Sequence, residues 1–485
     1  FSDADTLHWA LGSDLYSADL TKIDEDAEPE VVPIGFKEEH AHGGGQVALL
    51  GGKVISMSDS GVIEDSAIVI QNNRIVEVGP RAEVTIPADA HVVDVSGQVI
   101  LPGFIDTHAH GSQASDGITP QRNWVDYARL SFGVTTVHDP SNNTQEIFAA
   151  SEMTKAGVIT APRTFSTGTI LYGATGNFKA EVASVEDATF HLKRMKAVGA
   201  FSVKSYNQPR RDQRQQIVAA ARDLEMMVVP EGGSLFMSNM TMVVDGHTGV
   251  EHTLPVQYVY DDVMDLWRNT GVGYTPTLCV AYGGMSGEIY WYQESDLWKH
   301  PRLKTFIPPQ ILNPRSRRRP TAPLEDFNHI KVASITKKLV DNGNMVQAGG
   351  HGQLNGICTH WEMWSFVQGG MTPMESLRCG TLNGARYLGL DGDLGSIEEG
   401  KLADLIIIED GYDPSKNIRH SERIQYVMAN GTIYDAATMN KIGDEVETRE
   451  PFFWVSHGLG LARGALPTSG CLHCRPGASR LSSRH

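Results

Sequence analysis

The chain has 485 residues, 41% of them hydrophobic and 20% charged, a composition that fits a globular protein and excludes disordered and fibrous classes. Its 41 Lys and Arg residues against 58 Asp and Glu residues give a net charge of -17, which makes nucleic acid and acidic membranes poor partners. No apolar run reaches the roughly 20 residues that span a bilayer, so we expect no membrane partner.

Residues 1–46 are expected to form a small β unit or an extended arm. The text TLHWALGSDLYSADL reads as two short strands around a Gly-Ser-Asp turn, a pattern typical of one blade edge of a propeller. The chain begins at Phe1 without a charged and apolar leader. We therefore expect a processed, excised or partial product.

Two distant segments, 47–100 and 391–440, both read as short β-strands. The first contains alternating apolar runs around Asn72-Asn73, and the second contains the hairpin signal Asn430-Gly431. Because they flank one long middle region, we predict that they combine into a small composite β-sandwich.

The middle region, 101–390, alternates short apolar strands with stretches of helical period. This pattern predicts an α/β fold, a (β/α)8 TIM-like barrel, whose chemistry lies at the carboxyl ends of its strands. Within it, the stretch 279–328 is a long excursion before the last strand, and its aromatic part, 288–298, is expected to be exposed and to cover a substrate or a partner subunit. The eight predicted strands end at His110, Asp139, Thr169, Ser205, Glu231, His252, Thr277 and His351.

The last residues, 455–485, lack periodicity and are expected to form an irregular tail. Cys471 and Cys474 in this tail have the spacing of half a zinc site, but no second pair accompanies them, so a disordered terminus is the other reading. The five Cys residues are too few and too scattered to indicate a disulfide framework.

The sharpest chemical signal is Phe104-Ile-Asp-Thr-His108-Ala-His110. Two His residues separated by one residue on a strand point to the same face, so both imidazoles can bind one metal at the strand's end. The pair follows directly on LPGFIDT, at the predicted junction of sandwich and barrel. We therefore predict a metal site here.

Several motifs together make the chain resemble the amidohydrolase superfamily, in particular its imidazolonepropionase-like and Xaa-Pro-dipeptidase-like branch. The motifs are GGKVIS, VILPGFIDTHAHG, GVTTVHD, GVEH and TLNGARYLGLDGDLGSIEEGKLADLIII. The resemblance implies one or two divalent metals, Zn above all, and hydrolysis of an amide-type carbon–nitrogen bond by a metal-activated hydroxide. The opening residues resemble the last blade of Tol-type propellers that precede some amidohydrolase domains, which gives a slight lean to a periplasmic or exported location.

Matched position by position, the family pattern implies four metal ligands directly. His108 and His110 match the first-strand pair, Lys204 in FSVKSY matches the lysine that becomes carboxylated, and His252 in GVEHT matches the sixth-strand ligand. An ammonium in an apolar strand is costly, so conversion of Lys204 to an anionic bridge between two cations is chemically sensible.

The chain departs from the family pattern at two ligand positions. Glu231 stands where the fifth strand of the family presents His, and His351 stands where the eighth presents Asp. Because both residue types bind zinc-like metals, the exchange keeps the ligand count and charge, and we include both in the predicted binuclear site. Either residue can instead have drifted from the metal, in which case His247 is a spare imidazole.

The exchange also moves the proton-transfer role. We assign it to His351 as a base held weakly near the metal, or to Glu231 on the opposite wall, because His is a competent base near neutral pH. His138 and Asp139 either line the pocket or make structural hydrogen bonds. The expected substrate contacts, each also readable as a packing or surface residue, are Tyr172, Tyr206, Arg210 and Tyr282.

These readings predict a metal-dependent hydrolase of a cyclic amide, an N-acyl amino acid or a small peptide, with a small molecule as its substrate. Two alternatives remain: an ester, lactone or phosphotriester hydrolase with the same site, and a degenerate, non-catalytic module of a larger protein. A homo-oligomer is compatible with a barrel of this kind, although no residue pattern indicates an interface.

Overall fold

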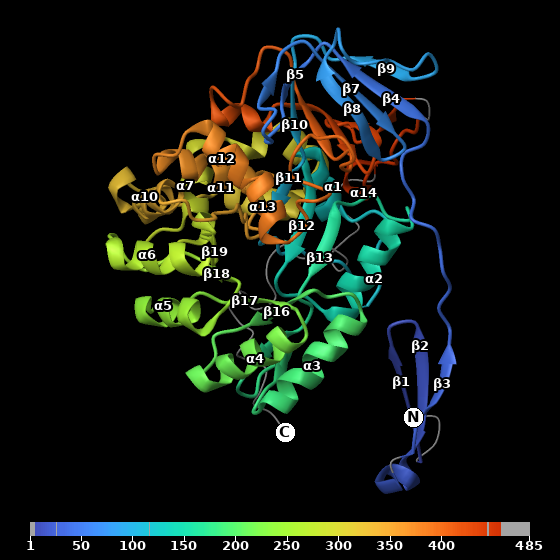
Figure 1. Ribbon diagram of the computed structural model, residues 1–485, viewed down its shortest axis with the longest axis vertical. Helices are drawn as coiled ribbons and strands as arrows, with labels where there is room; N and C mark the ends of the chain where they lie inside the picture. The colour runs from blue at the N-terminus through green and yellow to red at the C-terminus, as the bar shows by residue number, and fades with distance from the viewer. Residues whose placement is uncertain (1–4, 26, 116, 444–445, 457–485) are drawn as a thin grey trace.

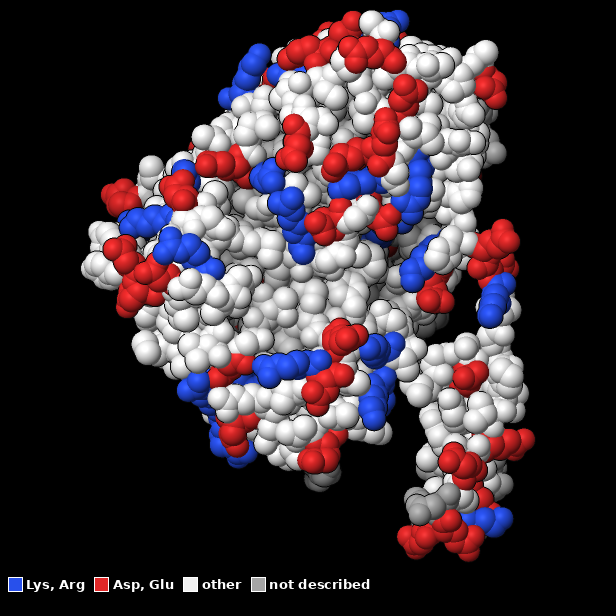
Figure 2. Space-filling view, in the orientation of Figure 1, with Lys and Arg blue, Asp and Glu red and all other residues white. Residues whose placement is uncertain are grey.

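The computed structural model describes residues 5–25, 27–115, 117–443 and 446–456. The tail after 456, with Cys471 and Cys474, lies outside these residues. Within them, no helix has the length and apolar character needed to cross a membrane. Acidic side chains gather at the top of the face seen in Figure 2 and on the N-terminal arm, while basic side chains are interspersed with acidic ones elsewhere on it.

The N-terminal residues form an arm that hangs beside the main body (Figure 1). It is a three-stranded antiparallel sheet in the order β1-β2-β3, in which Gly12 turns the chain between the first two strands with φ of 59°. Its bounds are β1 Thr6–Leu11, β2 Asp14–Asp19, the short helix η1 Leu20–Glu25 and β3 Glu30–Pro33.

Two neighbouring sheets lie outside the middle region: one consists of strands from the first flank alone, and the other combines strands from both flanks. The central contact is the antiparallel pair of β10 (Val99–Pro102) with β20 (Leu405–Ile408), which joins the two flanks. One sheet has the order β23-β22-β21-β20-β10-β5-β6 and the other β8-β7-β4-β9. The remaining bounds are β4 Gln46–Leu50, β5 Lys53–Ile55, β6 Val62–Ile63, β7 Ser66–Gln71, β8 Arg74–Pro80, β9 His91–Asp94, β21 Ile424–Ala429, β22 Thr432–Asp435 and β23 Lys441–Ile442.

The two sheets share one core of branched apolar side chains. Leu49 and Ile68 from the four-stranded sheet and Ile100 and Ile407 from the seven-stranded sheet are completely buried in it. The predicted Asn430-Gly431 turn connects β21 to β22 with φ of 52° and 79°, the left-handed values that a tight hairpin requires.

The middle region consists of parallel strands alternating with helices, an α/β arrangement (Figure 1). Parallel pairs run β11-β12-β13, β14-β16-β17 and β18-β19, with β15 added beside β14. The strands are β11 Phe104–Asp106, β12 Val134–Asp139, β13 Arg163–Ser166, β14 Ile170–Tyr172, β15 Lys179–Glu181, β16 Ser202–Ser205, β17 Met227–Pro230, β18 Gly249–Glu251 and β19 Gly273–Thr275. The helices are α1 Trp124–Ser131, α2 Thr144–Lys155, α3 Val185–Ala197, α4 Arg211–Asp223, α5 Phe236–Asp245 and α6 Asp261–Thr270.

Further backbone hydrogen bonds connect these groups of strands. The amide of Thr248 donates to Val228 at 3.0 Å, which joins β17 to β18. Val346 forms a parallel bridge with Tyr274 of β19, and the amide of Thr107, just after β11, donates to Ala348 at 3.0 Å. The segment 346–348 thus lies between β19 and β11, where the sequence predicts the last strand.

The excursion before the last predicted strand is largely helical, and its aromatic residues are not exposed as expected. Trp291 and Tyr292 on α7 are only 2% and 3% exposed, because they pack against Trp364 and Trp361 of α11 with ring centroids 5.4 Å and 5.5 Å apart. The helices of the excursion are η2 Leu278–Val280, α7 Gly287–Glu294, η3 Leu297–Lys299, α8 Pro301–Phe306, α9 Pro309–Arg317 and η4 Leu324–Asp326. The helices that follow it are α10 Asn328–Asp341, α11 Ile357–Gln368, α12 Pro373–Cys379, α13 Leu382–Tyr387, η5 Ile418–Glu422 and α14 Phe453–Ser456.

Candidate metal centre

Two buried imidazoles lie just beyond the end of β11. His108 and His110 are 0% and 2% exposed. The Nδ1 atom of His108 lies 2.6 Å from Oε2 of Glu251, and the Nδ1 atom of His110 lies 3.0 Å from Oδ1 of Asp139. Where the two carboxylates accept the Nδ1 protons, both Nε2 atoms present a lone pair. Burial raises the pKa of Glu251 to about 8, so its carboxylate form at neutral pH depends on nearby positive charge.

Two further imidazoles are oriented in the same way. His252 Nδ1 lies 2.7 Å from Oγ1 of Thr277, and His351 Nδ1 lies 3.1 Å from Oε1 of Gln353. Both histidines have left-handed backbone, with φ of 70° and 62°, a conformation that is uncommon outside glycine and collects at functional sites. The amide of His351 donates to the carbonyl of His108 at 2.7 Å, which fixes the segment after Ala348 against the first strand.

The four rings form one compact cluster. Ring centroids lie 4.9 Å apart for His108 with His110 and with His252, 5.0 Å for His108 with His351, and 4.8 Å and 5.1 Å for His351 with His110 and His252. Burial, followed by the neighbouring charges, holds the pKa values of His108 and His351 well below the ordinary value. These two imidazoles are therefore neutral, the form that binds a metal.

The donor atoms fit a divalent cation. Nε2 of His108 and Nε2 of His110 are 3.1 Å apart, and in the tautomers that carry both protons on Nδ1 no proton lies between them. Ligand atoms of His108, His110 and His351 all lie within 4.8 Å of one another. Lone pairs facing each other at this distance repel, and a cation between them removes the repulsion.

Lys204 and Glu231 lie on the opposite side of the cluster. Nζ of Lys204, which is 1% exposed, lies 2.6 Å from Oε2 of Glu231, and Oε1 of the same carboxylate lies 2.9 Å from Nε2 of His252. Burial by itself favours the neutral acid, but the charges of Lys204 and His252 outweigh it and hold the pKa of Glu231 well below its ordinary value. Glu231 is thus a carboxylate.

A glycine allows the two strands that carry these groups to approach. A Cβ atom on Gly232 would lie 1.7 Å from the carbonyl oxygen of Glu251, so any larger residue would push the end of β17 away from β18. The close approach keeps Glu231 within reach of His252.

The predicted substrate contacts divide into near and distant residues. Tyr282 donates its hydroxyl to the carbonyl of Gly232 at 3.1 Å, and its ring centroid lies 6.0 Å from that of His252. Tyr172 and Tyr206 contact each other with centroids 5.8 Å apart. The side chain of Arg210 is 63% exposed and pairs with Asp212 at 3.1 Å, and it makes no contact with the clustered histidines among the described residues.

Two other histidines of the sequence analysis lie outside the cluster. His138 Nε2 lies 2.8 Å from Oγ of Ser202, and burial lowers its pKa to about 4. His247 Nδ1 lies 3.0 Å from the carbonyl of Met242, at the end of α5, so it is not a spare imidazole at this centre.

Sequence reasoning missed three of the four side chains that hold the Nδ1 atoms of the imidazoles: Glu251, Thr277 and Gln353. Glu251 directly precedes His252, and strand alternation places neighbours on opposite faces. The left-handed backbone of His252 breaks that alternation, so both residues contact the cluster. For Asp139, the fourth of these side chains, the sequence left two roles possible, lining the pocket or making a structural hydrogen bond. In the structure it is a hydrogen-bond partner of His110.

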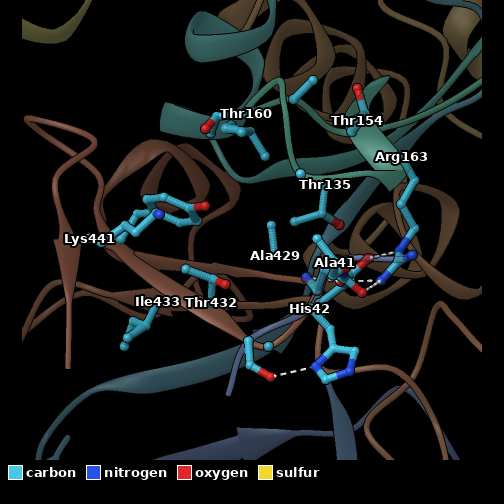
Figure 3. A pocket seen from close by; sticks show the side chains of 18 of the residues that line it. Ala41, His42, Thr135, Thr154, Thr160, Arg163, Ala429, Thr432, Ile433 and Lys441 are labelled. Carbon is cyan, nitrogen blue, oxygen red and sulfur yellow. Dashed lines mark hydrogen bonds and ion pairs between the residues drawn. The ribbon is translucent and has the colours of Figure 1, made fainter. Parts of the chain in front are cut away.

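A separate cavity of about 460 Å³ lies away from the cluster, between the linker residues 41–45, the start of β13 and the strands β21 to β23 (Figure 3). Arg163 crosses its wall, donating to Asp404 at 2.7 Å and to Asn430 at 2.6 Å. None of the clustered histidines lines it, and Arg163 is the first residue of β13, whereas the cluster lies at the carboxyl ends of the strands. The cavity is therefore distinct from the candidate centre.

Buried imidazoles gathered at the carboxyl ends of parallel strands, three of them able to hold a metal ion, are typical of an α/β metalloenzyme. The chain belongs to the amidohydrolase family, whose model matches residues 99–434. It is accordingly a metal-dependent hydrolase that acts on carbon–nitrogen bonds.

The individual proteins that this chain resembles have low sequence identity to it. An imidazolonepropionase from Erwinia tasmaniensis is 23% identical over 389 residues, which cover 73% of this chain and 90% of the relative. A Xaa-Pro dipeptidase crystallised with methionine in its active site superimposes with a TM-score of 0.62 at 20% identity, over 81% of this chain and all of the dipeptidase chain. A molinate hydrolase superimposes with a TM-score of 0.62 at 15% identity, over 82% of this chain and 96% of the other. At this identity the solved structures show a shared fold.

Proposed function

We propose that the chain hydrolyses an amide bond in a small molecule, namely a cyclic amide, an N-acyl amino acid or a small peptide. The observation that carries the proposal is the set of four buried imidazoles, each with Nδ1 next to a separate side-chain oxygen, with ligand atoms of His108, His110 and His351 within 4.8 Å of one another. The imidazolonepropionase relative and the Xaa-Pro dipeptidase neighbour, whose names denote such chemistry, support the same class.

The proposed metal ligands are those of the sequence analysis. His108, His110 and His351 would hold one divalent cation, and His252 with Glu231 and a carboxylated Lys204 would complete a second position. A divalent cation bound there supplies electrophilic assistance to the substrate carbonyl and lowers the pKa of a water molecule. Zn suits the imidazole and carboxylate donors.

Whether Lys204 is an ammonium or a carbamate depends on whether divalent cations are bound. As an ammonium it neutralises Glu231 at 2.6 Å, whereas as a carbamate it would place two anions side by side. Two anions at this distance need cations between them, so we propose that carboxylation of Lys204 and metal loading occur together.

Proton transfer is assigned to His351, which would be held near the cation weakly enough for its Nε2 to act as the base, with Glu231 as the alternative. Gln353 holds Nδ1 of His351, so Nε2 is the atom that faces the reaction centre. Both oxygens of Glu231 are engaged by Lys204 and His252, which favours His351. Tyr282, beside His252, would position the substrate, and Tyr172, Tyr206 and Arg210 would form the outer binding surface.

The architecture that we propose around the centre is a closed (β/α)8 barrel, 101–390, with a composite β-sandwich from 47–100 and 391–440. The bonds from β19 through 346–348 to β11 and the bond between β17 and β18 support closure. The pair β10-β20 and the shared core support the sandwich. The arm, 1–46, is proposed as a propeller-like remnant, because three antiparallel strands are compatible with part of a blade.

Elemental analysis of the metal content per chain, on wild type and on Lys204→Ala, tests the centre directly. We expect two equivalents in wild type, one or none in the variant, and a mass increase of one carbon dioxide in native wild type alone. Lys193→Ala on the outer face of α3 is the matched control. A wild type that binds no metal after reconstitution would instead support a degenerate module, and a panel of anilide, ester and phosphotriester substrates separates amide hydrolysis from the other hydrolytic classes.

A further inference from the structure

One ammonium is held between two aromatic rings at the mouth of the parallel strands. Nζ of Lys179, on β15, lies 4.1 Å from the ring centroid of Tyr172 and 4.6 Å from that of Tyr206. The two tyrosine rings meet edge to face, with centroids 5.8 Å apart. Neither β15 nor Lys179 is indicated by the sequence.

The strand geometry places this group on the side of the metal centre. Leu171, paired with Ser205 across β14 and β16, packs outward in the core formed with α3 and α4. Alternation along a strand therefore turns Tyr172 inward. Tyr206 follows Lys204 by two residues and so shares its inward face, toward Glu231.

The ammonium of Lys179 has no matching anion among the residues that the structure describes. Among the described residues, Lys179 forms no ion pair and no charged neighbour shifts its pKa, although the chain as a whole carries a charge of -17. Burial lowers the pKa of Lys179 from its ordinary value. Aromatic faces compensate a partly desolvated ammonium only in part, so an anion is the partner that the position lacks.

We propose that Lys179, together with Tyr172 and Tyr206, forms a carboxylate-binding subsite that selects substrates with a free carboxylate. This inference rests on the proposed hydrolysis of amides and narrows it to N-acyl amino acids and peptides, in preference to uncharged amides. Lys179 is a specificity residue in this scheme, because its ammonium contacts the substrate at a distance from the bond that breaks.

The test compares each of several N-acetyl amino acids and dipeptides with its own C-terminal carboxamide, which removes one negative charge and little else. We expect wild type to prefer the acids and Lys179→Met to lose kcat/KM on acids by about 10- to 100-fold, mainly through KM, the range for removing a charge-assisted hydrogen bond. The carboxamides should react equally with both enzymes. Lys179→Arg should retain the preference, and Lys193→Met, on the exposed face of α3, controls for net charge.

The outcomes separate this inference from the proposed function. Equal hydrolysis of acids and carboxamides by wild type overturns the subsite and leaves amide hydrolysis standing. If neither set is hydrolysed by the metal-loaded enzyme, the proposed function fails, and calorimetric titration with the same compounds decides the subsite. Binding of acids alone, lost in Lys179→Met, supports it, and equal or absent binding overturns it.

Discussion

The contact between His110 and Asp139 gives the most direct test of how the centre is held. Oδ1 of Asp139 accepts from Nδ1 of His110 at 3.0 Å and from the amide of Ser141 at 3.0 Å, while Oδ2 accepts from Asn142 at 2.7 Å. Replacing Asp139 with Asn keeps the volume and one oxygen. It removes the negative charge that fixes the His110 tautomer and raises the basicity of Nε2.

The expected size of the effect follows from this single bond. Loss of the carboxylate partner of one ligating imidazole reduces metal affinity by about 10- to 100-fold, which corresponds to roughly 1.4–2.8 kcal/mol. The folded structure should survive, because Asn retains an acceptor for Ser141. We therefore expect a wild-type circular dichroism spectrum and a weaker metal dissociation constant.

Competition with a chromophoric chelator at fixed free zinc measures that constant. Asp126→Asn is the matched control, because Asp126 is also buried, at 1% exposed, but lies beside Arg129 at 3.7 Å and contacts no clustered imidazole. The reasoning is refuted if Asp139→Asn binds zinc as tightly as wild type, or if Asp126→Asn loses as much affinity.

Three further outcomes are expected. Glu251→Gln should weaken zinc binding about tenfold or more in the same chelator competition, because Glu251 orients His108 at 2.6 Å. Tyr387→Phe should have a smaller effect, because it removes only a 2.9 Å hydrogen bond to the carboxyl group of Glu251. Burial lowers the pKa of His360 from 6.5 to about 4, so the unfolded chain takes up a proton at this residue at a higher pH than the folded chain does. The free energy of unfolding should therefore fall as the pH drops from 6.5 toward 4. In His360→Gln, denaturant titrations at several pH values should show a smaller fall of this free energy with pH. Removal of the metal by dialysis against chelator should abolish activity and lower Tm, both restored by zinc, and unchanged activity in metal-free protein would contradict the assignment.

The sequence was sufficient to predict which residues lie together where their placement depends on local spacing. His108 and His110 follow from alternation along one strand, and the junction of the two flanks follows from alternating apolar runs. The family pattern directed attention to Lys204, Glu231 and His351, which the structure brings to one cluster or its edge.

Other features depend on contacts between distant segments and left no local pattern. Glu251 reaches His108 across 143 positions, and only the positive φ of His252 lets both neighbours serve one centre. The aromatic residues of 288–298 looked like surface residues in a polar stretch, yet helix formation places Trp291 and Tyr292 against α11. Lys179 is identified only by the rings that surround it.

The antiparallel pair of β10 with β20 sets an order of events for the folding chain. Ile100 faces Ile407, so about 300 residues must be synthesised before this pair can close. Until then β10 remains an open edge directly before β11, the strand that carries His108. Such long-range pairing slows folding and exposes the nascent chain to aggregation, so complete formation of the metal centre is expected to be a late, post-translational event rather than one that proceeds strand by strand on the ribosome.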